Sequence, residues 1–201
     1  MHSSKALRAP RNAGTLRIVG GEWRSRRLTV PSRPGLRPTP DRVRETLFNW
    51  LGQRLDGLDC LDLFAGSGAL GFEAASRGAR GVTMVESDRE ALAALERNRA
   101  ALGAAQVRIV GGDAGAFLRS AAQDRFDVVF LDPPFRQNAL PAVLESLAAR
   151  LKPGARVYVE SESALEPAAP WTELRRAKAG QVSYQLLRWD AHDQGGLPGN
   201  V

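Results

Sequence analysis

The chain has 201 residues, of which 43% are hydrophobic and 25% are charged, and its formal net charge is +6. These values predict one globular domain with a modest appendage, and no apolar stretch approaches the roughly eighteen residues that a membrane-spanning helix needs. The single cysteine, Cys60, excludes an internal disulfide and favours a cytoplasmic protein, while His2 and His192 form no cluster with metal-ligand spacing.

The basic residues are concentrated at the front of the chain. Residues 1–50 hold eleven Lys and Arg against three acids, a net charge of +8, so the remaining residues sum to −2. An arginine-rich front on a nearly neutral body is typical of proteins that bind nucleic acids. We expect a basic, disordered tail over residues 1–14 and a frayed, glycine-rich tail over 191–201.

A hairpin is predicted behind the basic tail. Apolar residues alternate with arginines in Leu16–Val19 and in Arg27–Val30, which indicates two short strands. A stretch rich in Pro and Gly, from Pro31 to Pro40, then predicts a linker.

A helix is predicted after the linker. Thr39 suits its N-cap and Pro40 its first helical position. Arg42 and Arg44 lie off its apolar stripe, so we expect them to face the site or solvent. The stripe itself predicts docking on the main domain through Val43, Leu47, Trp50 and Leu51.

Strands and helices alternate over the rest of the chain, which predicts an α/β fold with a doubly wound sheet. A turn is predicted at Lys152–Gly154. The strands are expected at 59–63, 82–86, 106–110, 126–131, 155–159, 172–178 and 182–189, and the helices at 68–77, 88–102, 114–121 and 138–150.

A glycine loop follows the first strand of this domain. Gly66–Gly71 matches G-x-G-x-x-G, and Glu86 comes twenty residues after Gly66, which also fits a dinucleotide site. Asp62 at the end of the strand argues against a dinucleotide, because a carboxylate there would repel the pyrophosphate. It would attract the ammonium and sulfonium of S-adenosylmethionine (SAM), which carries no phosphate. The loop therefore predicts SAM.

Two further acids are candidates for the cofactor. Glu86 ends the second strand and is placed to accept both ribose hydroxyls, and Asp113 is placed to meet the adenine amino group. The alternative for such acids is a helix cap, by Asp88 for one helix and by Asp113 for the next. The predicted cofactor residues are Asp62, Phe64, Gly66, Gly68, Glu86 and Asp113.

Asp132–Phe135, with the sequence Asp-Pro-Pro-Phe, follows another apolar strand. An amine on a base ring is a poor nucleophile, so its methylation needs acceptors that orient both N–H bonds and stabilise the developing charge. Asp132 and a carbonyl of the stiff proline turn are such acceptors, and Phe135 offers a face for the base. We therefore predict methyl transfer to an exocyclic amine by Asp132, Pro133 and Phe135.

These strings resemble one known family. Arg37–Leu51 is similar to the front signature of the bacterial small-subunit rRNA guanine-N2 methyltransferases, which modify guanine 966 of 16S rRNA. The further matches, in order and spacing, are Asp62–Gly68, Val85-Glu86, Asp132–Phe135, Tyr158–Glu162 and Gly180–Val182. The resemblance implies a SAM-dependent, Rossmann-like fold with a seven-stranded, mostly parallel sheet whose last strand is reversed.

The resemblance also implies a substrate and a division of the chain. The expected partner is 16S rRNA in the small (30S) subunit, bound by a monomer without metal or membrane. Residues 15–53 would be an RNA-facing extension and 54–190 the methyltransferase domain. Glu160–Glu162 has no assigned role and is expected to be a solvated loop. The predicted RNA-binding residues are Arg17, Arg24, Arg26, Arg27, Arg37, Thr39, Arg42 and Arg44.

Three other functions stay open on the sequence alone. A DNA adenine or protein-glutamine N-methyltransferase uses a similar acid-or-amide, Pro, Pro, aromatic loop. A non-catalytic rRNA-binding assembly factor would keep the fold without turnover. An NAD-dependent oxidoreductase would use the glycine loop, against the charge of Asp62.

Overall fold

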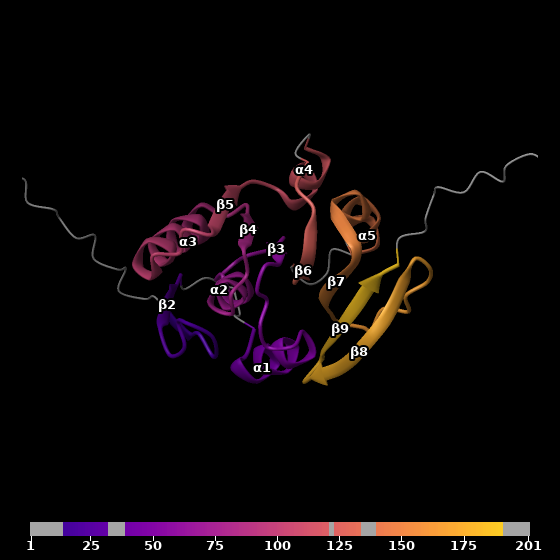
Figure 1. The fold of residues 1–201 in the computed structure, drawn as a ribbon, viewed down its shortest axis with the longest axis horizontal. Coiled ribbons are helices and arrows are strands. Elements are labelled where there is room, and N and C mark those ends of the chain that lie inside the picture. The colour runs from indigo at the N-terminus through magenta and orange to yellow at the C-terminus, as the bar shows by residue number, and fades with distance from the viewer. Residues whose placement is uncertain (1–13, 32–38, 121–122, 134–139, 191–201) are drawn as a thin grey trace, which may run out of the picture.

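The computed structural model describes residues 14–31, 39–120, 123–133 and 140–190. Its centre is a seven-stranded sheet in the order β5-β4-β3-β6-β7-β9-β8 (Figure 1). Neighbouring strands from β5 to β7 are parallel, and β9 runs antiparallel to both β7 and β8. The mostly parallel sheet with a reversed last strand is thus confirmed. Its strands are β3 (Asp59–Asp62), β4 (Gly81–Glu86), β5 (Val107–Gly111), β6 (Phe126–Leu131), β7 (Leu151–Ser161), β8 (Trp171–Ala179) and β9 (Val182–Trp189).

Helices cover the two faces of this sheet in separate groups. The core of one face combines the sheet with α1 (Asp41–Trp50), α2 (Ala69–Ser76) and α3 (Arg89–Leu102). The core of the other face includes α4 (Ala114–Arg119) and α5 (Leu140–Leu147), which a short 3₁₀ turn, Ala148–Arg150, follows. Since side chains alternate along a strand, each strand feeds both cores.

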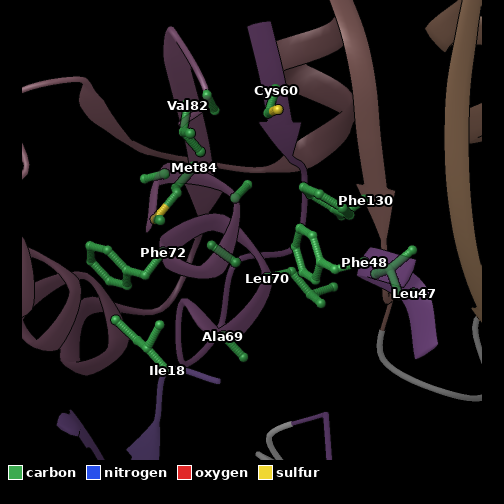
Figure 2. Close-up of a cluster of buried hydrophobic side chains, with 14 of the residues drawn as sticks. Ile18, Leu47, Phe48, Cys60, Ala69, Leu70, Phe72, Val82, Met84 and Phe130 are labelled. Atoms are coloured by element: carbon green, nitrogen blue, oxygen red, sulfur yellow. The ribbon is translucent and has the colours of Figure 1, made fainter. Parts of the chain in front are cut away.

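The front hairpin shares the core of the first face. Its strands, β1 (Gly14–Arg17) and β2 (Arg27–Val30), pair antiparallel with Leu16 opposite Leu28. Figure 2 shows Ile18 of the hairpin beside Phe72 of α2, with Phe48 of α1 and Phe130 of β6 in the same cluster. The hairpin and α1 are therefore packed parts of one structure, and the expected boundary at residue 53 stays a prediction.

Two predicted boundaries at the front were wrong. The first strand ends at Arg17 rather than Val19, because the backbone N–H groups of Val19 and Gly20 donate instead to the Glu73 carboxylate, at 2.9 and 2.8 Å. Helix α1 begins at Asp41 with Pro40 in the N-cap position and no side-chain cap. Thr39 therefore does not cap the helix.

The turn predicted at Lys152–Gly154 lies inside a strand. Strand β7 already begins at Leu151, and its pairing with β6 passes from Phe126↔Leu151 to Val128↔Arg156. The extra residues on β7 bulge out, and Gly154 there has φ of +74°, a left-handed conformation that suits glycine.

Candidate active site at the carboxyl edge of the sheet

Three neighbouring strands bring acids to one edge of the sheet. Asp62 ends β3 and pairs with Phe130 of β6, and Leu131 pairs with Val159 of β7. The next residues along β6 and β7 are Asp132 and Glu160, so these two acids come side by side. Open α/β sheets bind ligands at this carboxyl edge.

Asp62 is hydrogen-bonded to the backbone at the end of the glycine loop. Its side chain is buried, and Oδ2 accepts the N–H of Gly71 at 2.9 Å. Burial raises the pKa of Asp62 to about 7 and repulsion from Glu86 adds to this, while backbone N–H groups of Gly71 and Phe64 oppose the rise. Its predicted contact with a cationic cofactor stays a prediction.

The loop itself has the backbone that close approach to a ligand requires. Gly68 is the N-cap of α2 with φ of +78°, and Gly66 has φ of +49°. A Cβ at Gly68 would lie 2.6 Å from side-chain carbons of Leu95 and Phe72, so only glycine fits there. Phe64, also predicted to bind the cofactor, is half-buried against the core of the second face.

Glu86 is held between the glycine loop and the turn after β4. Oε2 accepts the N–H of Gly66 and Oε1 accepts the N–H of Asp88, both at 2.7 Å. These bonds orient the partly exposed carboxylate, and each of its oxygens has a second lone pair to offer. This arrangement suits the predicted contact with ribose hydroxyls.

Asp113 has the role that the sequence left as its alternative. Its Oδ1 accepts the N–H of Ala116 at 3.0 Å and caps α4, and its side chain is exposed. Asp88 caps α3 in the same way by accepting from Glu90 and Ala91. A contact between Asp113 and adenine stays a prediction.

Asp132 is partly exposed at the edge of the sheet, and Pro133 behind it is buried. Burial, followed by repulsion from Glu160 and Asp62, raises the pKa of Asp132 well above its usual value. Its carboxylate is therefore a better proton acceptor than an ordinary aspartate. Phe135 and the second proline lie outside the described residues.

The prediction for Glu160 was wrong. Glu160 is not in a solvated loop but inside β7, with 7% of its side chain exposed, and its Oε1 accepts the Tyr158 hydroxyl at 2.9 Å. Burial raises its pKa, which hydrogen bonds from Tyr158 and Thr39 partly offset. The signal in the sequence was the period of two, because Glu160 falls on the same strand face as the apolar Tyr158.

Two of the predicted RNA-binding residues are buried, so the structure does not place them on an exposed surface. Arg44 is fully buried, where it donates to Glu73 at 3.0 Å and to Asp41 at 2.6 Å. Thr39 is 5% exposed and faces Glu160. A phosphate cannot reach a guanidinium that is enclosed in this way. Arg37 lies outside the described residues, and the exposed candidates are Arg17, Arg24, Arg26, Arg27 and Arg42.

The exposed arginines lie on two elements, the hairpin and α1. Helices α2 and α3 start at the carboxyl edge and run to the opposite edge. Next to Arg24, the Trp23 N–H donates to Ser76 at the end of α2, and Arg26 donates to Ala101 near the end of α3. The tip of the hairpin therefore lies at the carboxyl-terminal ends of α2 and α3. Arg17, which is opposite Arg27 in the hairpin, pairs with Asp41 at the start of α1.

Comparison with known proteins identifies the family. The family model described as "Conserved hypothetical protein 95" matches residues 16–188. Ribosomal RNA small subunit methyltransferase D of Escherichia coli strain K12 is 46% identical over 189 residues, which cover 90% of this chain and 94% of the relative. The chain belongs to the ribosomal RNA small subunit methyltransferase D family.

Further relatives support the assignment. The protein of the same name from Haemophilus influenzae is 43% identical over 92% of this chain and 99% of its own length. The solved structure of yhhF from Escherichia coli has a TM-score of 0.80 and 47% identity, covering 89% of this chain and all of that one. The resemblance predicted from Arg37–Leu51 and the other strings is thus confirmed.

Two findings concern other classes of ligand. Within the part of the chain that the structure describes, no group of three or more His, Cys, Asp or Glu is arranged to hold a metal ion. None of the helices described there is long and apolar enough to cross a membrane.

Proposed function

We propose that this protein transfers a methyl group from SAM to the exocyclic N2 amine of guanine 966 in 16S rRNA of the small ribosomal subunit. The observation that carries the proposal is the place of Asp132, partly exposed at the carboxyl edge beside the glycine loop, in a chain whose relatives are small-subunit rRNA methyltransferases. The cytoplasm, the monomeric state and the use of the whole 30S subunit belong to the same proposal.

The residues at the carboxyl edge fit SAM. Glu86 and Asp62 are carboxylates that suit hydroxyl and cationic groups, and neither suits a pyrophosphate. Glu86 and the glycines at 66 and 68 would hold the cofactor, with Phe64 and Asp113 as further candidates. When bound, SAM supplies a methyl carbon made electrophilic by the sulfonium.

Asp132 would act on the amine of the target base. Its carboxylate and the carbonyl of Pro133 would accept the two N–H bonds and aim the nitrogen lone pair at the methyl carbon. Positive charge develops on that nitrogen during transfer, and a carboxylate that is already in place stabilises it without reorganising solvent. Phe135 is expected to stack on the base.

The exposed arginines would hold the RNA. Arg42 is on α1, whereas Arg17, Arg24, Arg26 and Arg27 are on the hairpin, with Arg17 opposite Arg27. Because the tip of the hairpin packs on the ends of α2 and α3, whose starts lie at the carboxyl edge, its arginines would contact a part of the rRNA away from the target base. This favours a large, folded RNA over a free base or a short strand.

A substrate panel tests the proposal against its alternatives. Purified protein with labelled SAM would be given small subunits from cells that lack the gene, naked 16S rRNA, double-stranded DNA and a glutamine-containing release-factor peptide. We expect label in 16S rRNA alone, and loss of that label with Asp132→Ala at unchanged SAM affinity. Label in DNA or peptide, or SAM-independent binding of subunits without any transfer, would replace this proposal by one of its alternatives.

A further inference from the structure

Glu160 is a buried acid that is not needed to orient the amine. The fold places it beside Asp132, since Leu131 and Val159 pair one residue earlier on β6 and β7. Its side chain is buried while Asp132 is partly exposed. Glu160 is thus the more deeply buried of the two neighbouring acids. A buried carboxylate is costly unless its bonds are satisfied, so its position calls for an explanation.

The neighbours of Glu160 hold it as an acceptor. The Tyr158 hydroxyl donates to Oε1 at 2.9 Å, and Tyr158 in turn lies against Tyr184 of β9, with 6.3 Å between ring centroids. The Thr39 hydroxyl, just ahead of α1, also contacts Glu160. Both groups donate to oxygen and favour the charged form of the acid, against the burial that raises its pKa.

We propose that Glu160 is a positioning residue that acts through Asp132, with its fixed negative charge making Asp132 the acceptor for the proton that the methylated nitrogen releases. The inference rests on the proposed function and deepens it, since it assigns the fate of a proton that methyl transfer must shed.

The balance of the step defines what Asp132 must do. The nitrogen lone pair forms the new C–N bond, and the electrons of the C–S bond return to sulfur, which becomes a neutral thioether. The nitrogen is left cationic with one proton too many. That proton passes to a carboxylate oxygen of Asp132 and later to water, so no further reactant is needed.

The charged and titratable groups around Asp132 agree with this role. Glu160 on β7 and Asp62 on β3 both repel a second negative charge, and Tyr158 and Tyr184 add no positive one. Among the described residues, no Lys or Arg makes an ion pair with Asp132 or Glu160. The cation that develops on the substrate is therefore the group that this pair of acids would neutralise.

The test separates the charge of Glu160 from its shape. Glu160→Gln keeps the shape without the charge, Glu160→Asp keeps the charge, and Glu162→Gln makes the same chemical change at an exposed position two residues away. Single-turnover methylation of small subunits would be measured against pH for each variant, with SAM affinity and thermal melts alongside.

We expect Glu160→Gln to lower the rate about ten- to hundredfold with unchanged SAM affinity, because the proton acceptor is weakened. Without the repulsion the pKa of Asp132 falls, so the acidic limb of the pH profile moves to lower pH. Glu160→Asp should retain the wild-type limb and most of the rate, and Glu162→Gln should match the wild type.

Three results would overturn the inference. The first is a Glu160→Gln variant with the wild-type rate and the wild-type acidic limb of the pH profile. The second is a Glu160→Gln variant whose rate is reduced by the same factor at every pH, with the acidic limb unmoved. The third is a Glu160→Asp variant as slow as Glu160→Gln. If Glu160→Gln does not fold, Glu160→Asp is compared with Glu162→Gln, and a Glu160→Asp variant that is at least tenfold slower with unchanged SAM affinity would overturn the inference. Failure of the wild-type protein to methylate subunits would contradict the proposed function, and is seen before any variant is compared.

Discussion

At the scale of single residues, Asp62 should make the stability of the protein depend on pH. Its pKa is about 7 in the folded state and about 3.9 in an unfolded chain. Between these values the folded state binds more protons, so stability falls as pH rises from about 4 through 7. The charged form then costs up to about 4 kcal/mol above pH 7. The Gly71 N–H donates to the Asp62 carboxylate in spite of that cost.

Asp62→Asn removes the cost and keeps an acceptor for the Gly71 N–H. Thermal melts without SAM would give the melting temperature of the variant minus that of the wild type. We expect this difference to be larger at pH 8 than at pH 5 by roughly 5–10 °C. Asp113→Asn, at an exposed acid, should show the same offset from wild type at both pH values. A constant offset for Asp62→Asn as well would mean that Asp62 is not buried as a neutral acid.

Glu86 should contribute to binding of SAM rather than to the chemical step. Glu86→Ala removes the proposed acceptor for ribose hydroxyls and the hydrogen bond from the Gly66 N–H. A charge-assisted hydrogen bond contributes about 1.5–3 kcal/mol, so calorimetry should show SAM affinity reduced roughly ten- to hundredfold. An affinity within about twofold of wild type would remove Glu86 from the cofactor site.

The acids at the carboxyl edge differ in how far the sequence predicted them. Asp62, Glu86 and Asp132 each end or follow a strand, and the ends of parallel strands meet at one edge, so their grouping followed from the pattern alone. The burial of Arg44 could not be found in this way, because it depends on the packing of α1 against α2, whereas the burial of Glu160 had a signal in the period of two along β7. Whether a charged residue is buried depends on the partners that neutralise it, and a sequence pattern does not show partners that are distant along the chain.

At the scale of the elements, α1 is joined to α2 by a buried ion pair. Arg44 donates to Glu73 at 3.0 Å, and Arg77 donates to the other oxygen of Glu73 at 2.9 Å. Glu73 also accepts from the hairpin backbone at Val19 and Gly20. This one carboxylate therefore holds together three parts of the front of the protein.

Arg44→Ala should destabilise the fold, whereas Arg42→Ala on the same helix should not. Removing one partner of a buried ion pair costs about 3–5 kcal/mol because the other charge stays behind, which lowers the melting temperature by roughly 6–20 °C. Arg42 is exposed, so its loss should leave the melt unchanged and weaken RNA binding. If Arg44→Ala melted like wild type and lost only RNA affinity, Arg44 would bind RNA after all.

Element positions were predicted well where periodicity was long, and less well at ends. Strands β6 and β9 have the predicted bounds, and α3 begins one residue later than expected. The errors at β1, α1 and β7 have one cause, which is that tertiary partners replaced local ones. The backbone after β1 donates to Glu73 instead of to a neighbouring strand. The Thr39 hydroxyl contacts Glu160 instead of capping α1. Pairing with β6 continues β7 on both sides of a bulge.

At the scale of the whole molecule, the hairpin arginines should set affinity for the RNA without affecting chemistry. The variant is a charge reversal at Arg24, Arg26 and Arg27 of the hairpin, whose tip packs on the ends of α2 and α3. We expect weaker binding of subunits, with the slope of log affinity against log salt flatter by about 0.7 for each phosphate that the variant no longer binds. SAM affinity and the rate at saturating subunits should be unchanged.

The controls for the triple reversal are a thermal melt and the matched reversal Arg42→Glu on α1. A folded triple variant with the wild-type salt slope and affinity would remove the hairpin from RNA binding. A normal affinity with a reduced rate would place these arginines near the reacting amine, in conflict with the structure.

The central claim is that Asp132 directs methyl transfer to one guanine of 16S rRNA. Mass mapping of 16S rRNA from a strain that lacks the gene, complemented with the wild-type gene or with Asp132→Ala, tests it most directly. We expect unmethylated guanine 966 in the deletion strain, N2-methylguanosine restored by the wild type, and little or none restored by the variant, whose rate should be about 10²–10³ lower. Guanine 966 that stays methylated in the deletion strain, or full methylation by Asp132→Ala at equal protein level, would contradict it.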